Sequence, residues 1–161
     1  MVLLAGIFLS QICFGADLPK RKSGLWEMKL TGAGMPGHVS QTCVDQKSDD
    51  LMKQDVEEKM SCSKTDMRRE PGKLIVDSVC KIEGSTATTR SVITGDFDSA
   101  YRVDSKTTYT PPLADLKEGS VVIDAKWLGP CKPGQEPGDI VIPGAGKLNL
   151  EELMKHAPKK P

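Results

Sequence analysis

The sequence predicts an all-β protein with minor α content, an antiparallel meander of about seven strands that forms a curved sheet or half-barrel. Three observations predict this fold class. Apolar and polar residues alternate in segments bounded by turn-forming residues. The links between most segments are short, so consecutive strands should pair. A sheet of this many strands curls rather than staying flat. The expected strands span residues 24–31, 38–44, 61–69, 73–83, 85–94, 101–109 and 120–129.

Each strand should place its larger apolar residues on one face of the sheet. In GLWEMKLT (24–31) these are Trp26, Met28 and Leu30, two residues apart. The same spacing holds on the later strands for Tyr101, Val103, Ser105, Thr107 and Tyr109, and for Val121, Ile123, Ala125 and Trp127. Between these two strands, TPPLADLKEG (110–119) contains two prolines, so we expect a loop that does not pair.

Two segments have helical character. SDDLMKQDVEEKM (48–60) repeats its apolar residues every four positions and carries acidic residues in its first turn, with Ser48 as the expected cap. We expect this inserted helix to lie against the sheet. LEELMKH, near the C-terminus, follows Asn149, which with Glu152 is typical of a capping box for a short final helix.

The N-terminal residues 1–15, MVLLAGIFLSQICFG, form an uncharged apolar run typical of a Sec-type signal peptide. The run is short for a membrane span, and we expect none after its removal before Ala16. A buried N-terminal strand or helix is the alternative. Residues 16–23 then form a solvated basic link, residues 24–131 the β-domain, and residues 132–161 a Pro/Gly-rich tail with the short helix.

Cysteine spacing predicts two disulfides. Signal removal takes away Cys13 and leaves four cysteines, an even number that in an exported chain indicates a disulfide framework. Cys62 and Cys80 lie almost symmetrically about Pro71-Gly72, so folding the chain at this turn brings them opposite each other on an antiparallel pair. By elimination Cys43 pairs with Cys131, which closes a long loop.

Composition excludes several classes of partner. Basic and acidic residues number 22 each, so the chain has no net charge that would attract nucleic acid or an anionic membrane. Hydrophobic residues make up 38% and aromatics 4%, which predicts a thin core that gains from covalent cross-links.

Several motifs taken together resemble a known family. They are GLWE (24–27), CSK (62–64), VDSVCK (76–81), TGDFDSAY (94–101) and WLG-P-C (127–131). This set resembles the bacterial family catalogued as domain of unknown function 3617, whose members are small exported proteins that open with G-L-W-E after the signal. The resemblance implies a periplasmic location. It implies no activity and no catalytic residues.

The residues themselves offer little for catalysis or metal binding. No nucleophile lies in a recognised motif beside His38 or His156, and Asp96 and Asp98 sit in a segment typical of a turn. We therefore expect a non-enzymatic protein without a cofactor. Met35 and His38 are weak candidates for copper, because thioether and imidazole groups bind it in oxidising compartments.

Four aromatic side chains should share the concave face of the sheet: Trp26, Tyr101, Tyr109 and Trp127. Large and small residues alternate around them, which is typical either of an ordinary core or of a pocket in a curved sheet. The leading hypothesis is that this face binds a lipid-like or other apolar small molecule. The alternative is an envelope protein-interaction module with a packed core, and copper handling is a third.

Overall fold

The computed structural model describes residues 18–32, 35–50 and 61–156. Its strands are β1 (Gly24–Gly32), β2 (Met35–Val44), β3 (Ser61–Glu70), β4 (Lys73–Ile82), β5 (Ser85–Asp96), β6 (Ala100–Leu113), β7 (Leu116–Gly129), β8 (Asp139–Ile142) and β9 (Gly146–Asn149). The final helix is α2 (Leu150–His156), and residues 46–50 are also helical.

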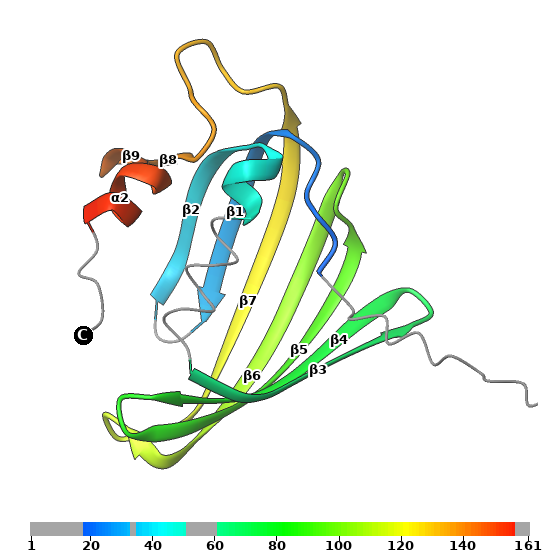
Figure 1. Ribbon diagram of the computed structural model, residues 1–161, viewed down its shortest axis with the longest axis vertical. Coiled ribbons are helices and arrows are strands. Elements are labelled where there is room, and N and C mark those ends of the chain that lie inside the picture. The colour runs from blue at the N-terminus through cyan, green and yellow to red at the C-terminus, as the bar shows by residue number, and fades with distance from the viewer. Residues whose placement is uncertain (1–17, 33–34, 51–60, 157–161) are drawn as a thin grey trace, which may run out of the picture.

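All nine strands form one antiparallel sheet, in the order β3-β4-β5-β6-β7-β1-β2-β8-β9. The predicted fold class, an all-β curved sheet with little helix, is confirmed. Figure 1 shows the sheet bent into a trough, with β3 and β4 along one edge and β8, β9 and α2 beyond β2 at the other. The meander is interrupted once, because β1 pairs with β7 and β2 does not pair with β3.

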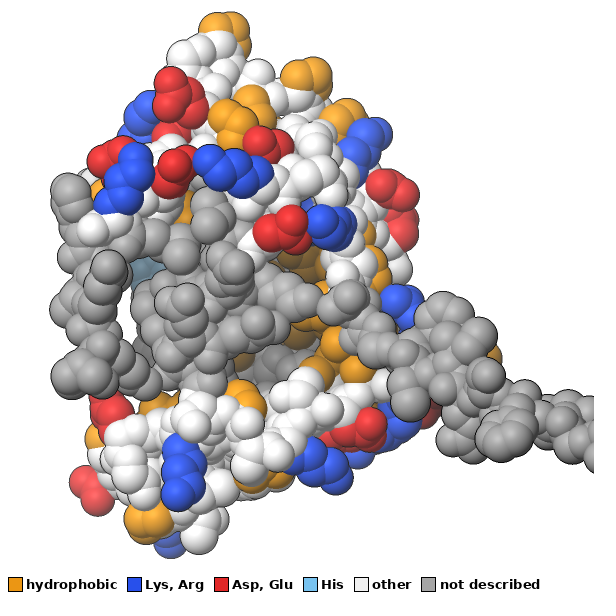
Figure 2. Space-filling model, viewed as in Figure 1, with side chains coloured by type: hydrophobic (Ala, Val, Ile, Leu, Met, Phe, Trp, Pro, Cys, Tyr) orange, Lys and Arg blue, Asp and Glu red, His pale blue; other side chains and the backbone are white. Residues whose placement is uncertain are grey.

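The pairing of the strands shows which side chains lie on the same face of the sheet. Trp26 is paired with Trp127, Ala125 with Tyr101, Val103 with Ile93, and Ile93 with Leu74, so these side chains share the inner face. The outer face carries the charged residues of the same strands, and β6 alternates between half-buried and exposed along most of its length. Figure 2 shows apolar side chains within the hollow and charged ones around its rim.

Both predicted disulfides are present. The Cys43–Cys131 bond joins β2 to the segment after β7 across 88 residues, and the Cα atoms lie 5.4 Å apart. The Cys62–Cys80 bond joins β3 to β4, and its Cα atoms lie 3.8 Å apart, closer than is usual for facing residues. The register of β3 shifts between Cys62 and Lys64, so a bulge lies beside this bond.

The prediction of an unpaired loop at residues 110–119 was wrong. Strand β6 continues to Leu113, strand β7 starts at Leu116, and only Ala114 and Asp115 form the turn. Both turn residues have positive φ, 47° and 67°, as in the two-residue hairpin turns whose twist matches the sheet. The prolines are tolerated because they fall where the β6–β7 register shifts, between Thr108 and Leu113.

The first of the two helices begins at a different residue from the one predicted. The first helix begins at Gln46, and Asp45 rather than Ser48 caps it. The Ser48 N–H donates to the Asp45 carboxylate at 2.7 Å, while the Ser48 hydroxyl accepts from the Asp45 N–H at 2.9 Å. Residues 51–60 of the predicted helix lie outside the described residues. The final helix matches its prediction, and Asn149 accepts from the Glu151 N–H at 3.0 Å.

The tail contains a hairpin that was not predicted as strand. β8 pairs with β2 through Gln41 and Thr42, and β9 pairs with β8. These two strands extend the sheet beyond β2 and bring α2 back toward the helical residues 46–50 (Figure 1). The C-terminal segment therefore forms part of the same sheet as the rest of the chain.

Candidate functional site

The inner face has a small apolar cluster near one end of the trough. Its buried members are Trp26, Val44 and Ala125, against which Met28, Tyr101 and Trp127 pack. Strand pairing places them together, since Met28 faces Ala125 and Ala125 faces Tyr101. Three of the four predicted aromatic residues therefore meet here.

Trp26 is the centre of this cluster. Its side chain is 0% exposed, and its indole Nε1 donates to the Lys22 carbonyl at 2.7 Å. The ring lies 5.5 Å from the Tyr101 ring at a tilt of 50°, a favourable aromatic arrangement. Burial in this environment raises the pKa of the Tyr101 phenol above its ordinary value.

Phe97 also belongs to this aromatic group, although the sequence reasoning did not select it. Its ring stacks on Tyr101 with centroids 4.5 Å apart. The 96–99 turn holds it there, because the Asp96 carboxylate accepts from the N–H groups of Asp98 and Ser99 at 2.9 and 2.7 Å. The available signal was its position inside the TGDFDSAY motif, four residues before Tyr101.

Trp127 is half-buried and differs from Trp26 in its surroundings. Its indole N–H donates to the Ser23 carbonyl at 3.2 Å, and the Lys22 ammonium lies 3.9 Å from the ring centroid. This distance is typical of a cation–π contact. Trp127 therefore holds the segment before β1 through Lys22 and Ser23, and the Lys22 side chain covers one face of its ring.

Tyr109 does not join the other three. It shares their face but lies eight residues beyond Tyr101 on β6, roughly 26 Å away at the rise of a strand. Around it the inner face is rich in hydroxyl groups. The Thr89 and Thr107 hydroxyls lie 2.8 Å apart, and so do those of Ser91 and Ser105. The inner face is therefore apolar at one end and hydroxyl-rich toward the other.

The prediction of a solvated basic link holds for the exposed Lys20 and Lys22 but was wrong for Arg21. Arg21 is buried, and its guanidinium pairs with the Asp49 carboxylate at 2.7 Å. The Arg21 backbone N–H donates to the same carboxylate at 3.0 Å, and one guanidinium nitrogen lies 3.7 Å from the Met28 sulfur. Arg21 therefore joins the link, the helical residues 46–50 and β1. Lys20 adds an exposed pair with Asp50 at 3.0 Å.

The weak copper candidates are not brought together by any observed contact. His38 is exposed on β2, and the side chain of Met35 lies outside the described residues. Among the described residues, no group of three or more His, Cys, Asp or Glu side chains could hold a metal ion. The copper hypothesis therefore gains no support here.

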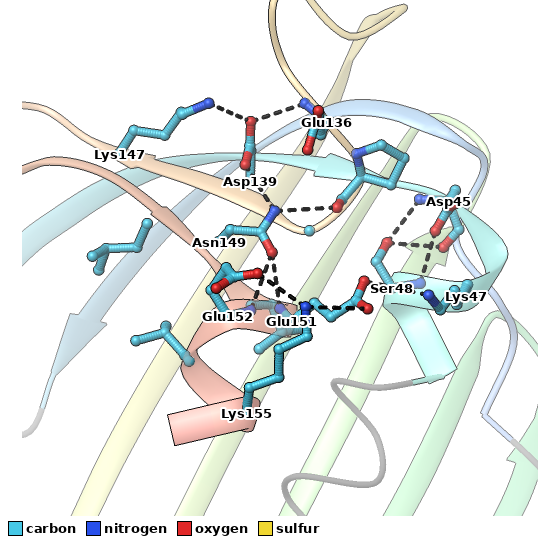
Figure 3. Close-up of a pocket in the computed structure, with 15 residues that line it drawn as sticks. Asp45, Lys47, Ser48, Glu136, Asp139, Lys147, Asn149, Glu151, Glu152 and Lys155 are labelled. Carbon is cyan, nitrogen blue, oxygen red and sulfur yellow. Dashed lines mark hydrogen bonds and ion pairs between the residues drawn. The ribbon is translucent and has the colours of Figure 1, made fainter. Parts of the chain in front are cut away.

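A second hollow lies away from the predicted residues. This cleft of about 910 Å³ lies between the helical residues 46–48, the β8–β9 hairpin and α2 (Figure 3). Its wall contains the buried Asp139, which accepts from Lys147 at 2.9 Å, from Asn149 at 2.8 Å and from the Glu136 N–H at 2.8 Å. Burial alone would raise the pKa of Asp139, but these donors together lower it below its ordinary 3.8. The polar groups of this wall are satisfied by one another.

Protonation of the Asp139 carboxylate should contribute to the loss of folding stability in acid. A carboxyl whose folded-state pKa is lowered stabilises the fold at neutral pH, and this contribution is lost as the pH falls through 3.8 toward the folded-state pKa. Asp139→Asn should flatten the acid limb of unfolding free energy against pH, measured by urea titration from about pH 5 downward. Lys147→Met, which removes one of the donors, should flatten it less. An unchanged acid limb in Asp139→Asn would contradict this role.

The comparisons with known proteins add one match. The model of a family described as "Protein of unknown function (DUF3617)" matches residues 21–131. No curated protein and no solved structure matches the chain. The matched region starts at the buried Arg21 and ends at Cys131, so it includes the aromatic cluster and both disulfides, while β8, β9 and α2 lie outside it.

Proposed function

The chain belongs to the DUF3617 family of proteins of unknown function, and from this premise we propose that it is an exported, periplasmic binding module. In this proposal the inner face of the trough takes a lipid-like or other apolar small molecule, without catalysis. Two disulfides are compatible with an oxidising compartment. No helix among the described residues has the length and hydropathy of a membrane span.

One observation carries the proposal. Apolar side chains in the middle of the inner face remain partly exposed on three strands: Val76 on β4, Val103 on β6, and Val121 and Ile123 on β7. Ile93 of β5, between β4 and β6, is buried. In a filled core such side chains would be buried, as Trp26 is. A partly exposed apolar strip on a concave sheet supports the binding of an apolar ligand.

The arrangement also gives such a ligand an orientation. The Trp26 cluster forms an apolar end, and the paired hydroxyls of Thr89–Thr107 and Ser91–Ser105 lie farther along the trough. An amphiphile with a neutral head group would match this gradient, with its hydrocarbon part toward Trp26. The outer face instead carries ion pairs such as Arg102–Asp124 at 2.8 Å.

Native mass spectrometry tests the proposal. Protein purified from its host without detergent should carry mass beyond the polypeptide, and after organic extraction it should rebind a monoacylglycerol or a long-chain fatty alcohol, whose head groups are neutral. Val103→Asp, which places a charge on the inner face, should weaken this binding by about tenfold or more. Thr108→Asp is the matched control, because it adds the same charge to the exposed outer side of the same strand.

Folding of the variants needs its own check. Circular dichroism should show the same strand content in Val103→Asp as in the parent chain. Val103→Thr keeps nearly the same shape and replaces one methyl group by a hydroxyl, so it should weaken binding with less effect on folding and can replace the charged variant if that variant unfolds. Polypeptide mass alone from the host, together with no binding of either probe, would overturn the proposal.

A further inference from the structure

The two edges of the sheet differ. One edge is β9, a strand of four residues, and the other is β3, a strand of ten. In the described part of the chain, β3 pairs with β4 on one side and with no strand on the other. All residues of β3 are exposed except Met67 and Arg68, which are half-buried. A long open edge presents backbone N–H and C=O groups that can pair with another strand.

Only part of β3 is regular enough to pair. The bulge between Cys62 and Lys64 disrupts the start of the strand, and the Cys62–Cys80 bond holds that end to β4. From Lys64 to Glu70 the register with β4 is continuous. Within this segment Lys64, Asp66, Arg68 and Glu70 lie on the outer face, and Thr65, Met67 and Arg69 lie on the inner face.

From this charge pattern we propose that β3 is a homodimer interface, in which two copies pair antiparallel about Met67 and join their sheets edge to edge. In this register Met67 faces Met67 of the second copy. Asp66 then faces Arg68 of the second copy, and Lys64 faces Glu70, each twice by symmetry. Opposite charges directly across an antiparallel pair stabilise it.

Neighbouring registers are disfavoured by the same residues. To keep the two inner faces on one side of the joined sheet, the register can move only in steps of two residues. A pairing about Asp66 sets Asp66 against itself and Lys64 against Arg68. A pairing about Arg68 sets Arg68 against itself and Asp66 against Glu70. Both place like charges opposite each other, which destabilises the pair.

Within the monomer Asp66 is only weakly compensated, whereas Glu70 already pairs with Lys73 at 3.0 Å. Asp66 and Asp77 face each other across β3 and β4, a like-charge pair. Arg68 lies between them, 3.5 Å from Asp66 and 2.8 Å from Asp77. Asp66 is thus the more weakly paired of the two carboxylates, and in the dimer it gains the guanidinium of the second copy's Arg68.

Sedimentation velocity at low ionic strength over a concentration series tests the interface. The parent chain should dimerise with increasing concentration, and added salt should weaken the dimer. Asp66→Arg turns both Asp66–Arg68 contacts into like-charge pairs and should weaken dimerisation about tenfold or more. The double variant Asp66→Arg/Arg68→Asp restores opposite charges and should recover the dimer. Asp98→Arg, in the exposed turn after β5, is the matched control.

Cysteine cross-linking provides a test that does not depend on charge. Met67→Cys places one thiol directly opposite another in the proposed register and should give a covalent dimer on mild oxidation. Thr65→Cys, two residues from the axis, should cross-link much less. A chain that stays monomeric at all concentrations overturns the proposal, and so does a dimer that Asp66→Arg leaves unchanged or that the double variant fails to recover.

Discussion

Replacing Cys43 and Cys131 together by serine is expected to lower the free energy of unfolding by about 4.5 kcal/mol. The bond spans 88 residues, so its loss releases a large loop in the unfolded chain. Cys43 is also 1% exposed and lies within the sheet, where a serine hydroxyl would be buried. Equilibrium unfolding in urea or guanidinium, under non-reducing conditions, measures the change.

The second disulfide provides the comparison. Cys62→Ser/Cys80→Ser opens a loop of only 18 residues, so the expected loss is smaller, about 3 kcal/mol. Cys80, like Cys43, is buried, so a buried serine hydroxyl adds to the loss at both bonds. For each bond, either single cysteine variant should lose about as much as the double variant, because one substitution already removes the cross-link. Strictly additive single losses, or a larger loss at Cys62–Cys80 than at Cys43–Cys131, would contradict the expectation.

Local patterns in the sequence predicted the main sheet well. Alternation in segments such as 101–109 identifies strands because every second residue lies on the same face, and the structure shows this in β6. The near-symmetric placement of Cys62 and Cys80 about Pro71-Gly72 predicted their pairing, because a tight turn nearly fixes the register of a hairpin. The turn alone would place Cys62 opposite Lys81, and the bulge between Cys62 and Lys64 brings it opposite Cys80. These features depend on residues near one another in the chain.

Features that depend on distant residues were missed. Strands β8 and β9 have four residues each, too few for alternation to identify, and they exist because β2 offers an edge for β8. Arg21 was expected to be exposed because nothing in residues 16–23 indicates that its guanidinium will form an ion pair with Asp49. Pro111 and Pro112 led to the prediction of a loop, so the two-residue turn at Ala114–Asp115 was missed. The shift of register in this part of β6 accommodates both prolines.

The same distinction applies to the candidate site. Trp26, Tyr101 and Trp127 were correctly expected on one face, and adjacent strands then brought them together. Tyr109 was correctly assigned to that face, but the face extends along the whole strand, so sharing it does not mean sharing a site. The membership of the cluster depends on which strands are neighbours in the sheet. The pairing of β1 with β7 could not be predicted from the order of the strands in the chain.

Trp26→Ala is expected to destabilise the fold by about 3–5 kcal/mol, because it removes a fully buried indole and leaves a cavity among Val44, Ala125 and Tyr101. It also leaves the Lys22 carbonyl without the indole N–H that lies 2.7 Å away. Thermal and urea unfolding followed by far-ultraviolet circular dichroism measure the loss, because this signal does not depend on the tryptophan removed.

Two variants separate the contributions at this position. Trp26→Phe keeps an aromatic ring but cannot donate to the Lys22 carbonyl, so we expect a smaller loss of about 1–3 kcal/mol from the unpaired carbonyl and the reduced volume. Trp127→Ala is the matched control, since the same substitution at a half-buried indole removes less buried surface. Equal losses for Trp26→Ala and Trp127→Ala would contradict the expectation that the fully buried Trp26 contributes more to stability than the half-buried Trp127.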